Sequence, residues 1–219
     1  IRSAERVADE TLVIDSYSKD DTVDRARHSG ARVIQNPWTS HAAQLNWALT
    51  NGGVHTDWVM RLDADEFLDD RLTAGINSAI ASAEDDIGAF ELNRRIHFLG
   101  RPIRHGGMAP LWTTRVWRNG WARCESRRTD EHMLLLRGRI ARLPGLLIDD
   151  NLNSLSWWTQ KHNDYATREA LDVLERRHRL GITDDLPTGL NRQARAKRWL
   201  KTRVYAGLPL GVRPWFYFF

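Results

Sequence analysis

Short apolar runs alternate with polar, helix-forming segments over roughly the first 80 residues. Residues 11–16, 31–34 and 58–63 are rich in apolar and β-branched side chains, and each run has the length of a strand. Helices are predicted between them, at about residues 21–28 and 40–50. Strands that alternate with helices in this order are typical of an α/β fold with a mostly parallel sheet flanked by helices.

Turn and capping residues support these boundaries. Gly30 is suited to end the first helix, and the pair Gly52 and Gly53 to end the second. Ser40 is suited to cap the start of the second helix. A third helix packed on the sheet is predicted from apolar residues that recur at every fourth position, namely Leu68, Leu72, Ile76 and Ile80.

The pattern changes after residue 87, where strands and turns replace the strand–helix alternation. Residues 89–92 and 111–117 are predicted strands, and Asn119-Gly120 gives a turn after the second. Residues 100–110 are rich in Gly, Pro, Arg and His. We interpret this segment as a loop beside a functional site.

Two helices are predicted towards the end of the chain, at about residues 154–178 and 190–205. We therefore expect a main α/β domain over residues 1–150 and a C-terminal helical extension over residues 151–219. With 219 residues, the chain is long enough to bury a full core.

Three acids end the apolar run at residues 58–62: Asp63, Asp65 and Glu66. Ligands of open α/β sheets bind beyond the carboxyl ends of the strands, where Asp63 and Asp65 are expected to lie. Two carboxylates so close repel each other, and Mg²⁺ or Mn²⁺ would relieve this repulsion. An alternative is an ordinary strand followed by the acidic N-terminus of a helix.

Charge is distributed unevenly along the chain. Residues 186–219 contain seven Lys or Arg and no acid, whereas the whole chain has a net charge of +4. A basic segment suggests an anionic neighbour, such as a membrane surface or nucleic acid. The single cysteine, Cys124, excludes an internal disulfide and suits a reducing compartment. No run of 18 apolar residues indicates a membrane span.

The second C-terminal helix is predicted to be amphipathic. Its apolar face is formed by Ala196, Trp199, Leu200 and Val204, and its basic face by Arg195, Lys197, Arg198 and Lys201. With the aromatic residues 215–219, it suits the plane of an anionic inner leaflet. An ordinary helix packed on the main domain is the alternative. Nucleic acid is not an expected partner, because no nucleic-acid-binding motif surrounds the helix.

Residues 13–22, 44–49 and 57–66 together resemble a family 2 glycosyltransferase with the GT-A fold, of the type that builds bacterial cell-surface polysaccharide or lipopolysaccharide. The first segment resembles the family's "VVDSxSxDxT" turn, and the last contains a DxD motif. The resemblance covers about residues 9–75 and continues more loosely through residues 130–132 and 157–170. Members begin with an earlier strand and helix, so we expect this chain to be part of a longer protein.

The resemblance implies roles for residues that bind the nucleotide sugar. Asp15 would contact the base or ribose, although it is also a residue type that forms turns. The DxD residues Asp63, Ala64 and Asp65 would bind the donor, with Asp63 near the ribose or a metal-bound water and Asp65 on the cation that bridges the diphosphate. His132 is a weaker candidate for the same metal site.

The resemblance also implies a base that activates the acceptor hydroxyl. Glu131 is preferred and Asp130 is the second candidate. The alternative is that these acids only pair with a neighbouring arginine. Arg94, Arg95, Arg101 and Arg104 are candidates for contacts with a diphosphate or an anionic acceptor.

The function implied is that of an inverting, metal-dependent hexosyltransferase. It would use Mn²⁺ or Mg²⁺ to move a sugar from a nucleoside diphosphate sugar to a hydroxyl of a cell-envelope glycan or glycolipid. It would be cytoplasmic and peripheral to the inner face of the plasma membrane. A nucleotidyltransferase of related topology and a non-catalytic membrane-associated module are the alternatives.

Overall fold

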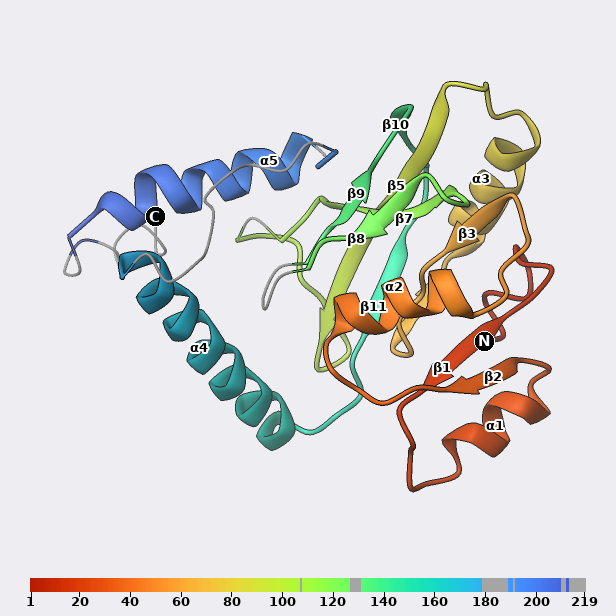
Figure 1. Ribbon diagram of the computed structural model, residues 1–219, viewed down its shortest axis with the longest axis horizontal. Coiled ribbons are helices and arrows are strands. Elements are labelled where there is room, and N and C mark those ends of the chain that lie inside the picture. The colour runs from red at the N-terminus through yellow and green to blue at the C-terminus, as the bar shows by residue number, and fades with distance from the viewer. Residues whose placement is uncertain (107, 127–130, 179–188, 191, 210–211, 213–219) are drawn as a thin grey trace.

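The computed structural model describes residues 1–106, 108–126, 131–178, 189–190, 192–209 and 212. A seven-stranded sheet forms its centre (Figure 1). The strand order is β3 (Trp58–Met60), β7 (Leu111–Arg118), β5 (Ile87–Phe98), β11 (Leu147–Asp150) and β4 (Glu66–Leu68). Two further strands pair with β5, namely β6 (Arg101–Pro102) and β10 (Arg139–Arg142).

Two small sheets flank the central one. Strands β1 (Leu12–Asp15) and β2 (Arg32–Gln35) are parallel. Strands β8 (Ala122–Cys124) and β9 (Met133–Leu135) are antiparallel, and Glu131 lies between them in the sequence.

The α/β class is confirmed, but the prediction of a mostly parallel sheet is wrong. In the central sheet β3–β7, β7–β5, β5–β6 and β4–β11 are antiparallel, whereas β5–β11 and β5–β10 are parallel. The strand–helix alternation stops after residue 81, and β5 returns to β7 without an intervening helix. A direct return of this kind gives antiparallel neighbours, because only a crossover makes adjacent strands parallel.

The predicted helices of the first part are confirmed as α1 (Thr22–His28), α2 (His41–Asn51) and α3 (Asp70–Ala81). The hydroxyl of Ser40 accepts from the amide of Ala43 at 3.1 Å and caps α2. The carboxylate of Asp69 accepts from the amide of Leu72 at 2.7 Å and caps α3. Each cap satisfies an amide that has no partner within its helix.

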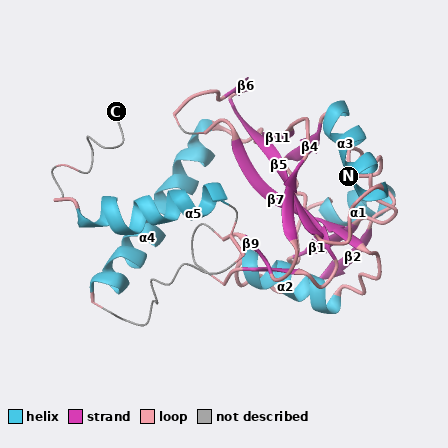
Figure 2. Cartoon of the chain, turned by 90° about the horizontal axis from the view of Figure 1, so that it is seen from above, coloured by secondary structure: helices cyan, strands magenta, loops and turns pink. Residues whose placement is uncertain are grey.

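Helices α2 and α3 cover opposite faces of the central sheet (Figure 2). Successive side chains of a strand point to opposite faces, so Phe90 packs on the α3 side while Ala89 packs on the α2 side. The core on the α3 side contains Leu68, Leu72, Ile76, Ile87, Phe90, Leu92, Val116, Leu143 and Leu147. The core on the α2 side contains Ala42, Ala89, Trp117, Ala122, Cys124, Met133 and Leu135.

The segment that ends in the three acids differs from its prediction. We interpreted it as a parallel strand buried on both faces, but β3 is an edge strand of the central sheet that pairs antiparallel with β7 and is only partly buried. The acids lie in the turn after β3 and at the start of β4, and Leu68 belongs to β4 and not to the helix. This turn brings Asp63, Asp65 and Glu66 together.

The C-terminal helices are α4 (Leu155–Arg177) and α5 (Arg192–Trp199), followed by a π-helical turn (Leu200–Val204) and a 3-10 turn (Tyr205–Gly207). They lie beyond the sheet, on the side away from β1, β2 and α1 (Figure 1). Within the described part of the chain, no helix combines the length and apolarity needed to cross a bilayer.

The amphipathic faces of α5 are oriented differently from our prediction. Ala194 and Arg198 are buried, and Ala194 packs with Leu134 of β9. The predicted apolar residues Trp199 and Leu200 are exposed by 50% and 43%. Arg198 therefore does not belong to an outward basic face. The side chain of Lys201 and residues 215–219 lie outside the described residues.

Candidate active site

A cleft of about 1590 Å³ lies between the sheet and the two C-terminal helices. Its floor contains the acidic turn after β3, and its walls include the loop before β9 and one face each of α4 and α5. The predicted site residues in its lining are Asp63, Ala64, Asp65, Arg94, Glu131 and His132, and Lys161 of α4 lines it as well. The fold thus brings together acids and bases that are up to about 100 positions apart in the sequence.

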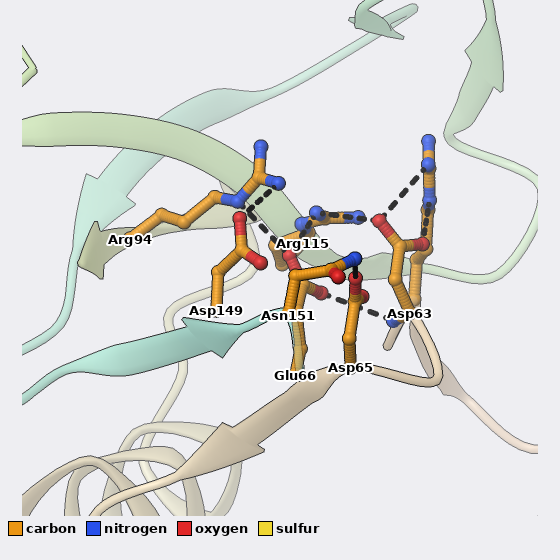
Figure 3. Close-up of polar contacts among 8 residues, drawn as sticks. Asp63, Asp65, Glu66, Arg94, Arg115, Asp149 and Asn151 are labelled. Carbon is orange, nitrogen blue, oxygen red and sulfur yellow. Dashed lines mark hydrogen bonds and ion pairs between the residues drawn. The ribbon is translucent and has the colours of Figure 1, made fainter. Parts of the chain in front are cut away.

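Asp63 is neutralised by two arginines (Figure 3). Arg61 donates to Asp63 Oδ1 at 3.0 Å, and Arg115 donates to Asp63 Oδ2 at 3.1 Å. Burial alone would raise the pKa of Asp63, but Arg115 and Arg61 outweigh it and hold the pKa well below its usual range. The repulsion that we expected a cation to relieve is thus already balanced at Asp63.

Glu66 lies behind Asp63, and its side chain is fully buried. It accepts from the amide of Asp63 at 3.0 Å and from Arg115 at 2.5 Å. Arg94 also pairs with Glu66, at 3.1 Å, and with Asp149 of β11 (Figure 3). Burial raises the pKa of Glu66 despite the neighbouring arginines. Glu66 supports the turn through these contacts.

Asp65 is the acid of this turn that remains open to the cleft. Its Oδ2 accepts from Asn151 Nδ2 at 3.0 Å (Figure 3). Its backbone carbonyl accepts from the amide of Asp150 at 2.9 Å. These contacts hold the turn against the end of β11 and fix where the carboxylate points.

A divalent cation at the floor of the cleft would need oxygen ligands from the acidic turn and its neighbours. No cluster of three or more His, Cys, Asp or Glu side chains suited to a metal occurs among the described residues. Mg²⁺ in proteins is, however, often held by one or two carboxylates together with substrate phosphates. Asp65 fits such a site, and Asp150 lies beside it in the cleft lining. The buried Oδ1 of Asp150 has no hydrogen-bond partner among the described residues and lies 4.0 Å from His97 Nδ1. The oxygens of Asp63 fit less well because they already accept from arginines.

Asp15 lies apart from the described lining of this cleft. It is 4% exposed, and it accepts from the amide and hydroxyl of Ser18 and from Gln35 Nε2 at 2.9 Å. The Ser18 and Gln35 side chains lower the pKa of Asp15. Asp15 therefore shapes the turn after β1, which was the alternative role considered for it, and a contact with a nucleotide remains a prediction.

The loop that carries Glu131 is anchored at its base. The amide of Glu125 donates to the carbonyl of His132 at 2.9 Å. Asn46 of α2 makes two hydrogen bonds of 2.9 Å with the backbone of Cys124. Glu131 itself lines the cleft, whereas Asp130 lies outside the described residues.

His41 of α2 shows that Glu131 and Asp63 face a common space. Burial and the charge of Arg61 lower the pKa of His41, and Glu131 and Asp63 act against this change. All four side chains line the cleft. The candidate base and the acidic turn thus lie near the same histidine.

His132 contacts the C-terminal helix. Arg198 of α5 donates to both carboxylate oxygens of Glu125, at 2.9 and 2.7 Å, and lies 3.3 Å from His132 Nδ1. An arginine can only donate, so Nδ1 of His132 is the acceptor in this contact. This geometry makes Nδ1 unavailable to a metal.

Sequence analysis missed Arg115, Asp149 and Asn151. Arg115 and Asn151 contact acids of the turn from 49 and 86 positions away. Asp149 contacts Arg94 from 55 positions away, so no local spacing marks any of the three. Among the arginines that were proposed, Arg94 lines the cleft, whereas Arg95, Arg101 and Arg104 are not in its described lining. No described residue of the loop 100–110 is in the cleft lining, but the carbonyl of Pro110 accepts from Gln193 of α5, which lines the cleft, at 2.9 Å.

The sequence is similar to that of known glycosyltransferases. The sequence profile described as "Glycosyl transferase family 2" matches residues 1–114, just over half of the chain. This match includes Asp15 and the acidic turn and ends before Glu131. The mixed α/β architecture is compatible with the GT-A fold.

Relatives occur in Rickettsia. An uncharacterized glycosyltransferase of Rickettsia prowazekii is 28% identical over 190 residues, which cover 82% of this chain and 64% of the relative. Uncharacterized glycosyltransferases of Rickettsia typhi and Rickettsia felis are 38% identical over 86 residues, which cover 39% of this chain and 29% and 30% of those proteins. The chain thus spans less than two thirds of these relatives.

Proposed function

The chain belongs to glycosyl transferase family 2, and from this we propose that it transfers a sugar from a nucleoside diphosphate sugar to a hydroxyl of a cell-envelope glycan or glycolipid. The observation that carries the proposal is the cleft, which combines an open carboxylate at Asp65 with a second carboxylate at Glu131. One carboxylate would hold the cation at the sugar donor, and the other would accept the proton of the acceptor hydroxyl.

The donor is assigned to the floor of the cleft, where Asp65 would hold a Mn²⁺ or Mg²⁺ ion. Bound there, the cation would offset the negative charge that gathers on the departing nucleoside diphosphate. The Arg61, Arg115 and Arg94 side chains pair with Asp63, Glu66 and Asp149. Asp65 has no ion pair with a described residue, which supports its assignment as a ligand of the cation.

Glu131 is assigned the role of base on the acceptor side. A carboxylate within reach of the acceptor hydroxyl removes its proton as the new bond to the sugar forms. Direct attack by that hydroxyl inverts the configuration of the sugar, which is the stereochemistry we propose. The hydrogen bonds of Cys124 and Glu125 support this role because they hold the ends of β8 and β9 on either side of Glu131.

A donor screen tests this function. The intact protein is incubated with nucleoside diphosphate sugars one at a time, with Mn²⁺ or with EDTA, and release of nucleoside diphosphate is measured. We expect release from one donor class and its loss with EDTA. A nucleotidyltransferase would release pyrophosphate from a nucleoside triphosphate instead, and a non-catalytic module would release neither product.

We also propose that α5 brings the protein to the inner face of the plasma membrane as a peripheral protein. Trp199 and Leu200 form an exposed apolar patch on or next to α5. Arg192, Arg195 and Arg203 are exposed on the same segment. An apolar patch with surrounding cations suits the interface of an anionic bilayer.

Replacement of Arg192, Arg195 and Arg203 by Gln is expected to weaken binding to anionic vesicles by up to about 3 kcal/mol, or roughly 100-fold, at low salt. Each cation near an anionic surface contributes about 1 kcal/mol. Co-sedimentation with phosphatidylglycerol and phosphatidylcholine vesicles measures the effect. Arg198 is left intact because it pairs with Glu125.

The matched control neutralises three exposed cations far from α5, namely Lys19, Arg25 and Arg27. This control should bind vesicles as the wild type does. Equal binding of the wild type to neutral and anionic vesicles, or binding to neither, would contradict the membrane proposal.

A further inference from the structure

One face of α4 forms a continuous wall of the cleft. Trp157, Lys161, Tyr165 and Glu169 all line it, and they follow each other at intervals of four residues. Residues four apart lie on the same face of a helix, and twelve residues extend about 18 Å along the axis. The wall therefore runs along about 18 Å of the cleft.

Trp157 and Tyr165 keep much of their ring surface accessible, at 40% and 41% exposure. The neighbouring Trp158 differs, because its ring packs against Phe98 of β5 at 5.2 Å and attaches α4 to the sheet. Trp158 thus explains how α4 is held, whereas Trp157 and Tyr165 line the cleft, and the Tyr165 ring also contacts His162 edge-on at 5.7 Å.

Lys161 lies between these two rings. Its ammonium nitrogen is 4.7 Å from the centre of the Trp157 ring and 5.8 Å from that of Tyr165. Lys161 makes no ion pair with the residues that the structure describes. Two aromatic rings with a cation between them therefore face the cleft. Lys197 of α5 adds a second positive charge to the lining.

The cleft is larger than one substrate requires. A single-ligand pocket has a volume of about 300–1,000 Å³, and this cleft has about 1590 Å³. The proposed function assigns its floor, at Asp65, to the donor. The space along α4 is then left for the acceptor, and Glu131 lines the same cleft.

We infer that the Trp157–Lys161–Tyr165 face of α4 binds the acceptor, and that the acceptor is a saccharide bearing an acidic group, either phosphate or carboxylate. The electron-rich faces of the aromatic rings attract the C–H groups of a sugar ring. The Lys161 ammonium attracts the acidic group. This inference rests on the proposed function, since it names the substrate class of the same site.

Saturation-transfer NMR on the intact protein tests the inference with glucose, glucuronate, glucose 6-phosphate and inorganic phosphate as probes. At least one acidic sugar should bind more tightly than glucose. Lys161→Gln should weaken the binding of that acidic sugar by about tenfold and so remove the preference. Trp157→Ala should weaken both acidic sugars and leave inorganic phosphate unchanged. A preference for glucose 6-phosphate alone would identify a phosphate-bearing acceptor, and one for glucuronate alone a carboxylate.

Two variants outside the cleft lining serve as controls, Leu171→Ala on α4 and Arg27→Gln on α1, and both should bind the probes as the wild type does. Equal binding of glucose and both acidic sugars by the wild type, or no binding of any sugar, would overturn the inference. So would a Lys161→Gln variant that loses affinity for UDP, GDP or ADP and keeps its sugar preference. Failure of the wild type to bind any nucleoside diphosphate would instead contradict the proposed function.

Discussion

Replacement of Glu131 by Gln is expected to lower turnover by about 10²–10⁴-fold while the affinity for the donor stays unchanged. Glutamine keeps the shape of the side chain but cannot accept the proton of the acceptor hydroxyl. The donor diphosphate is assigned to Asp65 at the floor of the cleft, and this change removes no contact proposed for it. Steady-state kinetics with the donor found in the screen, together with calorimetric titration of the nucleoside diphosphate, separate the two effects.

Asp130→Asn is the matched comparison, because Asp130 directly precedes Glu131 in the sequence and was the second candidate for the base. It should reduce turnover far less than Glu131→Gln does. If Asp130→Asn gives the large loss and Glu131→Gln does not, Asp130 is the base and our assignment is wrong.

Replacement of Arg115 by Met is expected to lower the free energy of unfolding by about 3–5 kcal/mol. Arg115 is 5% exposed and pairs with Asp63 and Glu66, so its loss leaves two acids without their shared cation. Breaking a buried ion pair by removing one partner has an effect of this size. For a chain of this length the melting temperature should fall by about 6–20 °C.

The control for Arg115 is Arg139→Met. Arg139 also pairs with two acids, Glu84 and Asp86, but all three side chains are at least half exposed. Exposed pairs contribute about 0–1 kcal/mol, so this variant should unfold close to the wild-type temperature. Adding Glu66→Gln to Arg115→Met should recover part of the loss. Equal stability of the two single variants would contradict the role given to Arg115.

Local signals in the sequence predicted the local structure correctly. Ser40 caps α2 as expected, and α4 begins and ends within one residue of its predicted limits. These features depend on residues within a few positions of each other. The DxD motif likewise marked the turn around which the cleft is built.

Contacts between distant segments were not predictable in this way. Arg115 and Asn151 reach the acidic turn only because β7 and β11 lie near it in the sheet. The order of strands in a sheet cannot be deduced from the spacing of apolar residues within one segment. The orientation of α5 was missed for a related reason. Arg198 is buried because Glu125, 73 positions away, neutralises it, so the amphipathic pattern alone pointed to the wrong face.

Calorimetric titration of the nucleoside diphosphate into the wild type and into Asp65→Asn, with and without Mn²⁺, tests the central claim most directly. Asp70→Asn serves as the control, because Asp70 lies on α3 and pairs with Arg6 at the surface. We predict that Mn²⁺ strengthens binding to the wild type and to Asp70→Asn, and that it has no effect on binding to Asp65→Asn, which stays folded. A Mn²⁺-dependent gain in affinity that survives in Asp65→Asn would contradict the assignment of this cleft as a metal-dependent donor site.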